Sequence, residues 1–278
     1  MHWADYTAQR LMERGGKQVS ASGITPSGEF HIGHLREILS AEMIHRACLD
    51  AGMSSKYIFI VDSMDPLRRV YDFLSPEYEE FIGCPLAYIP APDEDGSPGD
   101  GSVTYADHFL SPFLDSLEQI GVRPEVVMNH ETYERGLFAE YIDSAITNRE
   151  EIRSIIQQIS GRELPHDWFP YNPMGSGGSM DGVTVTGYEK PYVVWRDSSG
   201  NEGKSDIRKA HGKMPWRVDW AARWVIHGIT CEPAGKDHGA AGGSYDTGIP
   251  ICRLLGGNPP DKIVYEWIQL KGMGPMSS

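Results

Sequence analysis

Two histidines, His31 and His34, stand three residues apart directly after a glycine-bearing turn over residues 22–28. If a helix begins at about His31, its first N–H groups are free and carry a partial positive charge, which stabilises a bound phosphate. The two imidazoles could donate hydrogen bonds to phosphate oxygens while charge builds up on phosphorus. Gly33 between them has no side chain to block a flat base lying on the helix. A bare pair of this kind is more often two surface histidines, so the surrounding elements decide its meaning.

The elements around this pair follow the order of a βαβ unit. Residues 17–21 form a β-type run before the turn, residues 31–50 carry apolar side chains at helical spacing, and residues 56–61 form a second β-rich run. Strand, turn, helix and strand in this order predict two parallel strands joined by a right-handed crossover. The histidine pair therefore falls at the start of the crossover helix.

The alternation of strands and helices continues along the chain. A loop rich in Pro, Gly and Asp spans residues 85–101, and residues 161–214 have the turn-rich, β-type texture of a small insertion. The other predicted elements are a helix over 3–13, a helix over 105–119, a strand over 124–128, a long helix over 136–159, an apolar stretch over 216–229, a turn over 233–238, a helix over 244–255 and a strand over 263–268. Together they predict an α/β fold interrupted by one insertion.

The composition is that of a folded protein with an acidic surface. Of 278 residues, 39 are acidic and 25 are basic, and the net charge of −14 disfavours general attraction to nucleic acid or anionic membranes. No apolar run approaches the roughly 20 residues of a membrane-spanning helix, and no leader-like segment opens the chain, so we predict a cytoplasmic protein. The four cysteines are scattered, which predicts reduced packing residues rather than disulfides or a zinc cluster.

Several sequence blocks together resemble the class I aminoacyl-tRNA synthetases, and more narrowly the class I lysyl-tRNA synthetases of archaea and some bacteria. The blocks are residues 1–5, 22–28, 31–34, 216–220, 232–238 and 244–248, in the order in which that family has them. The resemblance implies a Rossmann-like parallel sheet with a small, inserted, β-rich connective domain. In this interpretation, residues 1–160 form the first half of the catalytic domain, 161–214 the insertion, and 215–278 the second half, which ends in a truncated loop of the Lys-Met-Ser-Lys-Ser type.

The resemblance also implies a reaction. ATP, accompanied by Mg²⁺, activates the lysine carboxylate, and the lysyl group then passes to the terminal adenosine at the acceptor end of tRNA. His31 and His34 match the family's phosphate-contacting histidines, and Gly23 and Thr25 match positions of the amino-acid pocket. The remaining matches are Gly28, Gly33, Gly235 and Asp237 at the ATP site and Trp220, His238 and Tyr265 around the lysine side chain.

Aromatic side chains around lysine are physically sensible, since a π face attracts an ammonium by about 0.5–2 kcal/mol. Core packing of Trp220 and Tyr265, and a surface position for Asp237, are the plainer alternatives. The sequence leaves open which acid pairs with the ε-ammonium, and the candidates are Asp62, Asp65 and Asp246.

The chain departs from the family near its C-terminus. Lys271, Met276 and Ser277 align with the loop whose lysines neutralise the departing pyrophosphate, but Pro275 stands where that loop has its first lysine. Members of the family continue into a helical anticodon-binding region, so we expect a fragment or a divergent paralogue. The insertion resembles the end of the family's zinc-binding insertion without its cysteines, so we expect no structural metal.

Three alternatives stand beside the leading hypothesis. They are a synthetase-like paralogue that activates an amino acid for an acceptor other than tRNA, a catalytically inactive module that binds ATP or an amino acid, and a histidine-motif nucleotidylyltransferase. The last would not account for Trp220, His238 and Tyr265. For the leading hypothesis the expected partners are lysine and the tRNA acceptor end, reached through a local basic patch such as Arg208 and Lys209, with no membrane. The resemblance implies a monomer.

Overall fold

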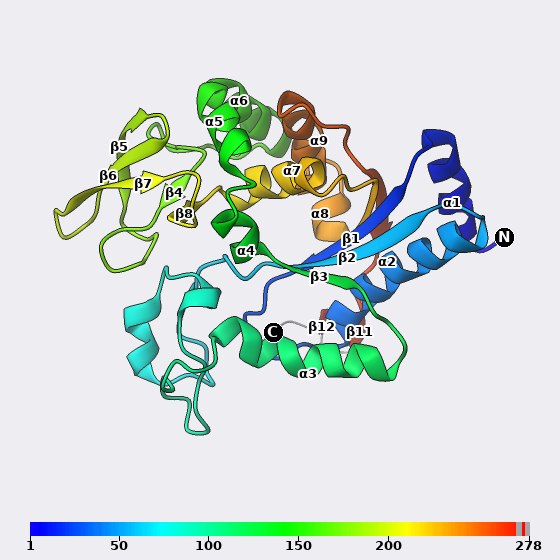
Figure 1. Ribbon diagram of the computed structural model, residues 1–278, viewed down its shortest axis with the longest axis horizontal. Helices are drawn as coiled ribbons and strands as arrows, with labels where there is room; N and C mark the ends of the chain where they lie inside the picture. Colours follow the sequence, from blue (N-terminus) through cyan, green and yellow to red (C-terminus); the bar gives the residue numbers. More distant parts are fainter. Residues whose placement is uncertain (271–273, 276–278) are drawn as a thin grey trace.

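The computed structural model describes residues 1–270 and 274–275, and Figure 1 shows a sheet lying between two groups of helices. The helices are α1 (Trp3–Arg14), α2 (Ile32–Asp50), α3 (Tyr105–Gln119), α4 (Asn129–Glu134), α5 (Ala139–Thr147), α6 (Arg149–Ser160), α7 (Trp216–Ile226), α8 (Lys236–Gly239) and α9 (Ser244–Leu254), with short 3-10 helices at Pro76–Phe81 and Leu86–Tyr88. The strands are β1 (Gln18–Ile24), β2 (Ser55–Val61), β3 (Glu125–Met128), β4 (Asn172–Pro173), β5 (Thr184–Glu189), β6 (Tyr192–Arg196), β7 (Glu202–Asp206), β8 (Gly212–Lys213), β9 (Cys231–Gly235), β10 (Asp261–Tyr265), β11 (Gln269–Leu270) and β12 (Gly274–Pro275).

The central sheet has five parallel strands in the order β10-β9-β1-β2-β3. The chain runs outward from β1 to β2 and β3, then returns to β9 on the other side of β1. The direction of winding therefore reverses between β1 and β9. In an open parallel sheet, such a reversal leaves a crevice at the carboxyl ends of the strands, where ligands bind.

The side chains of β2 alternate between two cores. Ile58 and Ile60 pack into one core with residues of α7 and α9, whereas Tyr57, Phe59 and Val61 pack into a second core with residues of α2 and α3. Because helices cover both faces, β2 is a continuous apolar run, which is typical of a parallel sheet. The predicted α/β fold is confirmed.

The buried side chains of the insertion between α6 and α7, such as Val193 and Ile207, belong to the same hydrophobic cluster as Ile58 and Ile60 of the central sheet. Strands β5, β6 and β7 form an antiparallel sheet, and β4 pairs with β8. Val193 of β6 is fully buried, and the Trp195 indole donates a hydrogen bond to the Ser205 hydroxyl at 3.0 Å. These contacts help to hold the strands of the insertion together. The domain boundaries at residues 160/161 and 214/215 stay a prediction.

The structure corrects several predicted elements. The long helix expected over 136–159 is two helices, α5 and α6, because the Asn148 side chain donates a hydrogen bond to the Ser144 carbonyl oxygen at 2.8 Å and competes with the helix there. Residues 233–235, expected in a turn, belong to β9, since pairing within the sheet overrides the local signal of Pro233. The strand expected over 263–268 lies at 261–265.

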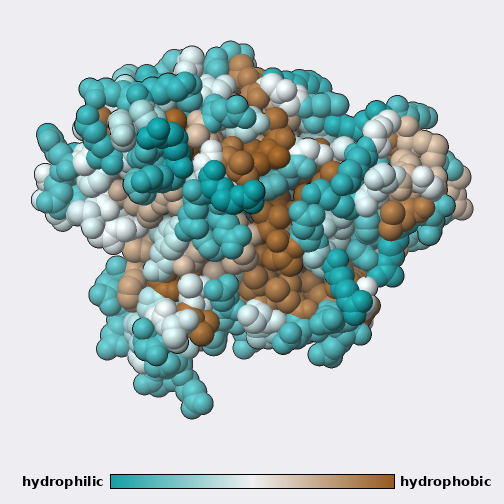
Figure 2. Space-filling view, in the orientation of Figure 1, coloured by the Kyte–Doolittle hydropathy of each residue, from teal (hydrophilic) through white to brown (hydrophobic). Residues whose placement is uncertain are grey.

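The outer surface is largely hydrophilic on the face drawn in Figure 2, where one hydrophobic band crosses between α7 and α3 over the edge strand β3. No helix within residues 1–270 and 274–275 is long and apolar enough to cross a bilayer. Cys48, Cys84, Cys231 and Cys252 are buried free thiols, as predicted. In the described part of the chain, no three His, Cys, Asp or Glu side chains are grouped to bind a metal ion.

Candidate active site

A cavity of about 610 Å³ lies at the carboxyl ends of β1, β2 and β9, where the winding of the sheet reverses. Gly23 and Thr25 reach it from the end of β1, Asp62 and Asp65 from the segment after β2, and Gly235 from the end of β9. A Cβ atom added at Gly23 would stand 3.7 Å from the Arg223 guanidinium and 3.8 Å from the Asp62 carboxylate, so glycine keeps this part of the cavity open.

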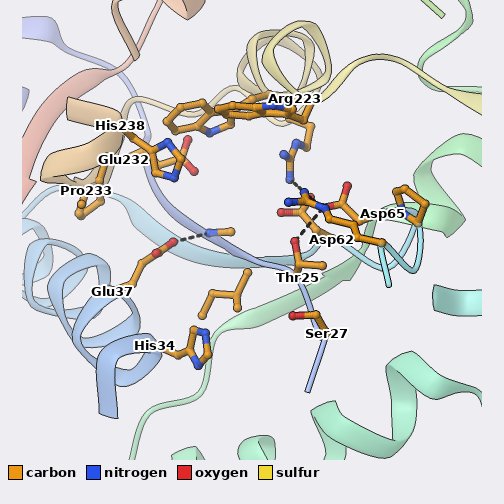
Figure 3. A pocket seen from close by; sticks show the side chains of 18 of the residues that line it. Thr25, Ser27, His34, Glu37, Asp62, Asp65, Arg223, Glu232, Pro233 and His238 are labelled. Carbon is orange, nitrogen blue, oxygen red and sulfur yellow. Dashed lines mark hydrogen bonds and ion pairs between the residues drawn. The ribbon is translucent and has the colours of Figure 1, made fainter. Parts of the chain in front are cut away.

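Glu37 forms an acidic end of the cavity (Figure 3). It lies on α2 one turn after His34, and its carboxylate accepts hydrogen bonds from the Gly23 N–H and the Tyr265 hydroxyl, both at 2.9 Å. Burial raises the pKa of Glu37 to about 8, and the nearby carboxylates of Glu232 and Asp62 also act to raise it. Among the described residues, no ion pair joins Glu37 to a cation. A cationic ligand would therefore stabilise its ionised form.

Aromatic rings form one wall of the cavity. Trp216 and Trp220 lie stacked at the start of α7 with centroids 6.3 Å apart, and the His238 ring meets their faces at 5.6 and 5.7 Å. Behind them, buried Glu232 accepts a hydrogen bond from the Trp224 indole at 2.5 Å. A wall of this kind suits a ligand with an apolar stem and a cationic group, because the rings cover the stem and attract the charge.

Two other acids of the cavity are paired with cations of the protein. Arg223 donates to Asp62 at 2.6 Å, and the Lys213 ammonium binds Asp65, with only 6% and 4% of the two cationic side chains exposed. Asp65 also accepts a hydrogen bond from the Thr25 hydroxyl at 2.7 Å. Burial acts to raise the pKa of Asp65, but the Lys213 charge, the hydrogen bonds from Lys213 and Thr25 and the Arg223 charge together outweigh it, and the pKa is lowered. Burial raises the pKa of Asp62 to about 6.

These pairs bear on the acids that the sequence offered for a substrate ammonium. Asp62 and Asp65 each bind a protein cation, and Asp246 pairs with Lys262 at 2.8 Å. Glu37 was not among the candidates from the sequence. Its position three residues after His34 was the available signal, since a side chain one turn on from His34 shares its helix face.

The histidine pair closes the first turn of α2. Nδ1 of His31 accepts a hydrogen bond from the Gly33 N–H at 3.0 Å, and Nδ1 of His34 accepts one from the His31 N–H at 3.1 Å. Since Nδ1 is the acceptor in both rings, each neutral imidazole carries its proton on Nε2 as a free donor. Burial lowers the pKa of both, that of His34 to about 4, so both are neutral at pH 7. A Cβ at Gly33 would lie 2.7 Å from His31 Cε1, so Gly33 makes room for the imidazole itself.

Asp237 lies beside the cavity, at the carboxyl end of β9. Its exposed carboxylate accepts a hydrogen bond from the Trp267 indole at 3.2 Å and lies 3.4 Å from His238 Nε2. A Cβ at Gly235 would come within 2.6 Å of the same carboxylate. The absence of a side chain at Gly235 thus allows the Asp237 carboxylate to lie against the end of β9 while it stays exposed to solvent.

The whole sequence matches one protein family, described as tRNA synthetases class I (K), over residues 1–278. The chain belongs to this family. The lysine–tRNA ligase of Picrophilus torridus is 44% identical and that of Archaeoglobus fulgidus 45% identical, each over 280 residues. These alignments cover 100% of this chain but 54% and 55% of the two ligases, so the chain spans about half the length of the curated relatives it matches. The resemblance inferred from the sequence blocks is confirmed.

Solved structures of class I synthetases are more distant from this chain. A tyrosyl-tRNA synthetase from Archaeoglobus fulgidus, complexed with L-tyrosine, has a TM-score of 0.48 and 14% identity over 99% of this chain and 62% of its own. Membership of the class I family therefore stands on the sequence match.

The class I synthetase chain brings about half of its predicted site residues to one cavity. Those that line the cavity are Gly23, Thr25, His34, Trp220, Gly235 and His238, and Tyr265 joins them through its hydrogen bond to Glu37. Those that lie outside its lining are Gly28, which packs against the Phe73 ring, His31, Gly33 and Asp237. Lys271, Met276 and Ser277 lie outside the described residues.

Proposed function

We propose that this chain binds lysine and ATP, forms lysyl-adenylate, and passes the lysyl group to tRNA(Lys). The observation that carries the proposal is the position of the Glu37 carboxylate at the end of the cavity, where the Gly23 N–H and the Tyr265 hydroxyl donate hydrogen bonds to it. Among the described residues, no protein cation forms an ion pair with this carboxylate. The relatives named lysine–tRNA ligase support lysine as the amino acid. The same resemblance supports action as a monomer in the cytoplasm.

The lysine side chain would lie along the aromatic wall of Trp220 and His238, with its ε-ammonium on Glu37. The ammonium converts Glu37 to its ionised form, because a cation next to a carboxylate lowers the pKa that burial has raised. Asp62 and Asp65 do not compete for it, since Arg223 and Lys213 already neutralise them. An uncharged or acidic side chain would leave Glu37 without a partner, and this selects lysine over glutamate.

ATP would lie across the start of α2, with its ribose at Asp237. The Nε2–H groups of His31 and His34 donate hydrogen bonds to phosphate oxygens, and the dipole of α2 adds positive potential at its N-terminus. The lysine carboxylate then attacks the α-phosphorus and pyrophosphate leaves, so catalysis consists of positioning and charge stabilisation. Mg²⁺ arriving with the nucleotide would neutralise phosphate charge, since hard cations prefer phosphate and water oxygens.

A calorimetric titration tests the proposal. The full chain is titrated with a non-hydrolysable lysyl-adenylate analogue, with the glutamyl analogue as control. Selective binding of the lysyl analogue, abolished in Tyr265→Ala, supports the site, whereas binding of neither analogue refutes it. Pyrophosphate exchange into ATP, measured with lysine and tRNA present, then separates an active enzyme from a module that only binds.

A further inference from the structure

Ser244 lies behind the cavity wall and carries a hydroxyl that the proposed site does not use. It is the first residue of α9, is 2% exposed and does not line the cavity. Its Oγ atom lies 2.7 Å from Nδ1 of His238, and the His238 ring does line the cavity (Figure 3). A buried hydroxyl bonded to a ring that faces the ligand indicates a role in holding that ring.

The first turn of α9 does not use the Ser244 hydroxyl. The N-cap of α9 is Gly243, and among the described residues no side chain caps the helix there. A serine at the start of a helix commonly bonds to the N–H groups of that helix, whereas Ser244 bonds to His238 of α8. A Cβ atom added at Gly243 would lie 2.4 Å from the His238 carbonyl oxygen. Glycine at this position therefore lets α9 start close enough to His238 for the hydroxyl to reach the ring.

The second ring nitrogen of His238 faces a carboxylate. Nε2 lies 3.4 Å from Oδ2 of Asp237. Because a carboxylate only accepts hydrogen bonds, its charge favours a proton on Nε2 and disfavours a bare nitrogen there. Burial lowers the pKa of His238, so the ring is neutral at pH 7 and carries a single N–H. Nδ1 is then the bare nitrogen, and it accepts a hydrogen bond from the Ser244 hydroxyl.

The same two contacts fix the orientation of the His238 ring. Its plane is inclined by 68° to the rings of Trp216 and Trp220, with centroids 5.6 and 5.7 Å away. The torsion about the Cβ–Cγ bond of histidine has broad minima, so packing and hydrogen bonds decide where the ring points. With Ser244 at one nitrogen and Asp237 at the other, a rotation about this bond breaks both contacts.

We propose that Ser244 is a positioning residue, whose hydroxyl donates to Nδ1 of His238 and holds the ring, with its proton on Nε2, against the aromatic wall of the cavity. The inference rests on the proposed function, in which this wall covers the stem of the lysine side chain. Ser244 affects the ligand only through His238. Without the hydroxyl the ring turns away from Trp216 and Trp220, and the wall fits the stem less closely.

Nitrogen spectra of the full chain test the state of the ring. In a chain with ¹⁵N-labelled histidine, long-range proton–nitrogen correlations distinguish a protonated ring nitrogen from a bare one, and His238→Gln identifies the signals of this ring. At pH 7 we expect a protonated Nε2 and a bare, hydrogen-bonded Nδ1 for His238. In Ser244→Ala the Nδ1 signal should move to the position of a bare nitrogen without a hydrogen bond.

Calorimetry with the lysyl-adenylate analogue measures what the held ring contributes to binding. Loss of one hydrogen bond behind the wall should lower the affinity of Ser244→Ala by roughly 3- to 10-fold, and Ser244→Thr, which keeps the hydroxyl, should bind like the unaltered chain. In a His238→Ala background, Ser244→Ala should have no further effect, because Ser244 acts through the ring. If Ser244→Ala weakens binding by the same factor with and without the His238 ring, the inference is wrong.

The matched control is Ser20→Ala. Ser20 is also a buried serine, 2% exposed, but it lies in β1 outside the cavity lining, and its hydroxyl has no hydrogen-bond partner in the described part of the chain. We expect Ser20→Ala to keep both the affinity and the His238 nitrogen signals of the unaltered chain. If Ser244→Ala leaves the Nδ1 signal in place, or Ser20→Ala moves it equally, the Ser244 hydroxyl does not hold the ring.

The nitrogen signals keep this test separate from the test of the proposed function, because they need no ligand. If the hydrogen-bonded Nδ1 is present and is lost in Ser244→Ala, but the unaltered chain binds no lysyl analogue, Ser244 holds the ring and the lysine assignment fails. If the unaltered chain binds the lysyl analogue and Ser244→Ala binds it equally tightly, the lysine assignment stands and the inference about Ser244 fails.

Discussion

Glu37 accepts two hydrogen bonds but forms no ion pair with a cation of the described residues, and this makes it the most informative residue to change. Glu37→Gln keeps the shape and removes the charge. Hydrogen bonds to charged groups contribute about 1.5–3 kcal/mol, so we expect lysyl-analogue affinity to fall by roughly 10- to 150-fold in calorimetry. Glu118→Gln, an exposed change of the same kind on α3, is the control and should leave the affinity unchanged. If Glu37→Gln binds the lysyl analogue as tightly as the unaltered chain does, Glu37 does not bind the lysine ammonium.

The raised pKa of Glu37 also makes binding dependent on pH. In the empty cavity burial raises this pKa to about 8, so the carboxyl is protonated at pH 7. A bound ammonium requires the ionised form, and binding below pH 8 therefore releases a proton. Affinity should rise by about tenfold per pH unit from pH 6.5 to 7.5 and level off above pH 8. His34 does not contribute in this range, because burial lowers its pKa to about 4.

Calorimetry in two buffers of different ionisation enthalpy measures how many protons are released when the lysyl analogue binds. We expect close to one proton released per analogue bound at pH 7, and none in Glu37→Gln. Proton release that survives in Glu37→Gln would assign the titration to a group other than Glu37.

At the residue scale, sequence predicted the parts of the site that carry a local signature. His34, Gly235 and Trp220 lie in short blocks whose order along the chain is distinctive, and all three line the cavity. Glu37 and Lys213 lie outside these blocks, although Glu37 follows His34 by three residues. Their roles depend on which residues the fold brings next to them, and those partners lie far away in the chain: Tyr265 for Glu37 and Asp65 for Lys213.

A buried ion pair joins strand β8 to the segment after β2. Lys213 binds Asp65, and Asp65 holds the Thr25 hydroxyl. Lys213→Met leaves a buried carboxylate without its cation, and removing one partner of a buried pair costs about 3–5 kcal/mol. We expect this decrease in the free energy of unfolding by denaturant. Lys204→Met, which removes an exposed cation from its pair with Glu189, should cost at most about 1 kcal/mol.

A double variant distinguishes the contribution of the ion pair to the free energy of unfolding from the contribution of side-chain packing. Lys213→Met/Asp65→Leu replaces both charges with apolar groups and should recover much of the stability that Lys213→Met removes. If the double variant is as unstable as the sum of the two single variants, the stability comes from packing of the lysine stem and not from the ion pair.

At the element scale, the elements with strong periodicity were predicted well. The helix at residues 105–119 was predicted at its observed bounds, and α2 and β2 were placed within a residue at each end. The break between α5 and α6 was missed, because a single side-chain hydrogen bond of Asn148 decides it. Strand β9 was partly missed, because Pro233 and Gly235 are tolerated only through the pairing that the whole sheet provides.

The whole molecule carries a net charge of −14, and this decides how salt affects its stability. Self-repulsion destabilises the compact state, and raising NaCl from about 10 to 150 mM shortens the Debye length from about 30 to 8 Å. The exposed ion pairs that salt also weakens contribute only about 0–1 kcal/mol each. We therefore expect the melting temperature at pH 7 to rise with NaCl in scanning calorimetry. A fall would mean that surface ion pairs outweigh the net repulsion.

The position of β1 in the sheet has a consequence for synthesis of the chain. β1 lies between β2, which follows it closely, and β9, whose Cys231 pairs with Ser20 from 211 positions further along. At about 5–20 residues per second, a ribosome needs roughly 10–40 s to make that stretch. During this time the strand that lies at the centre of the finished sheet has an uncovered edge, which is a template for wrong pairing. Slow translation of residues 161–214, which lie between the two strands in the chain, would lengthen this exposure.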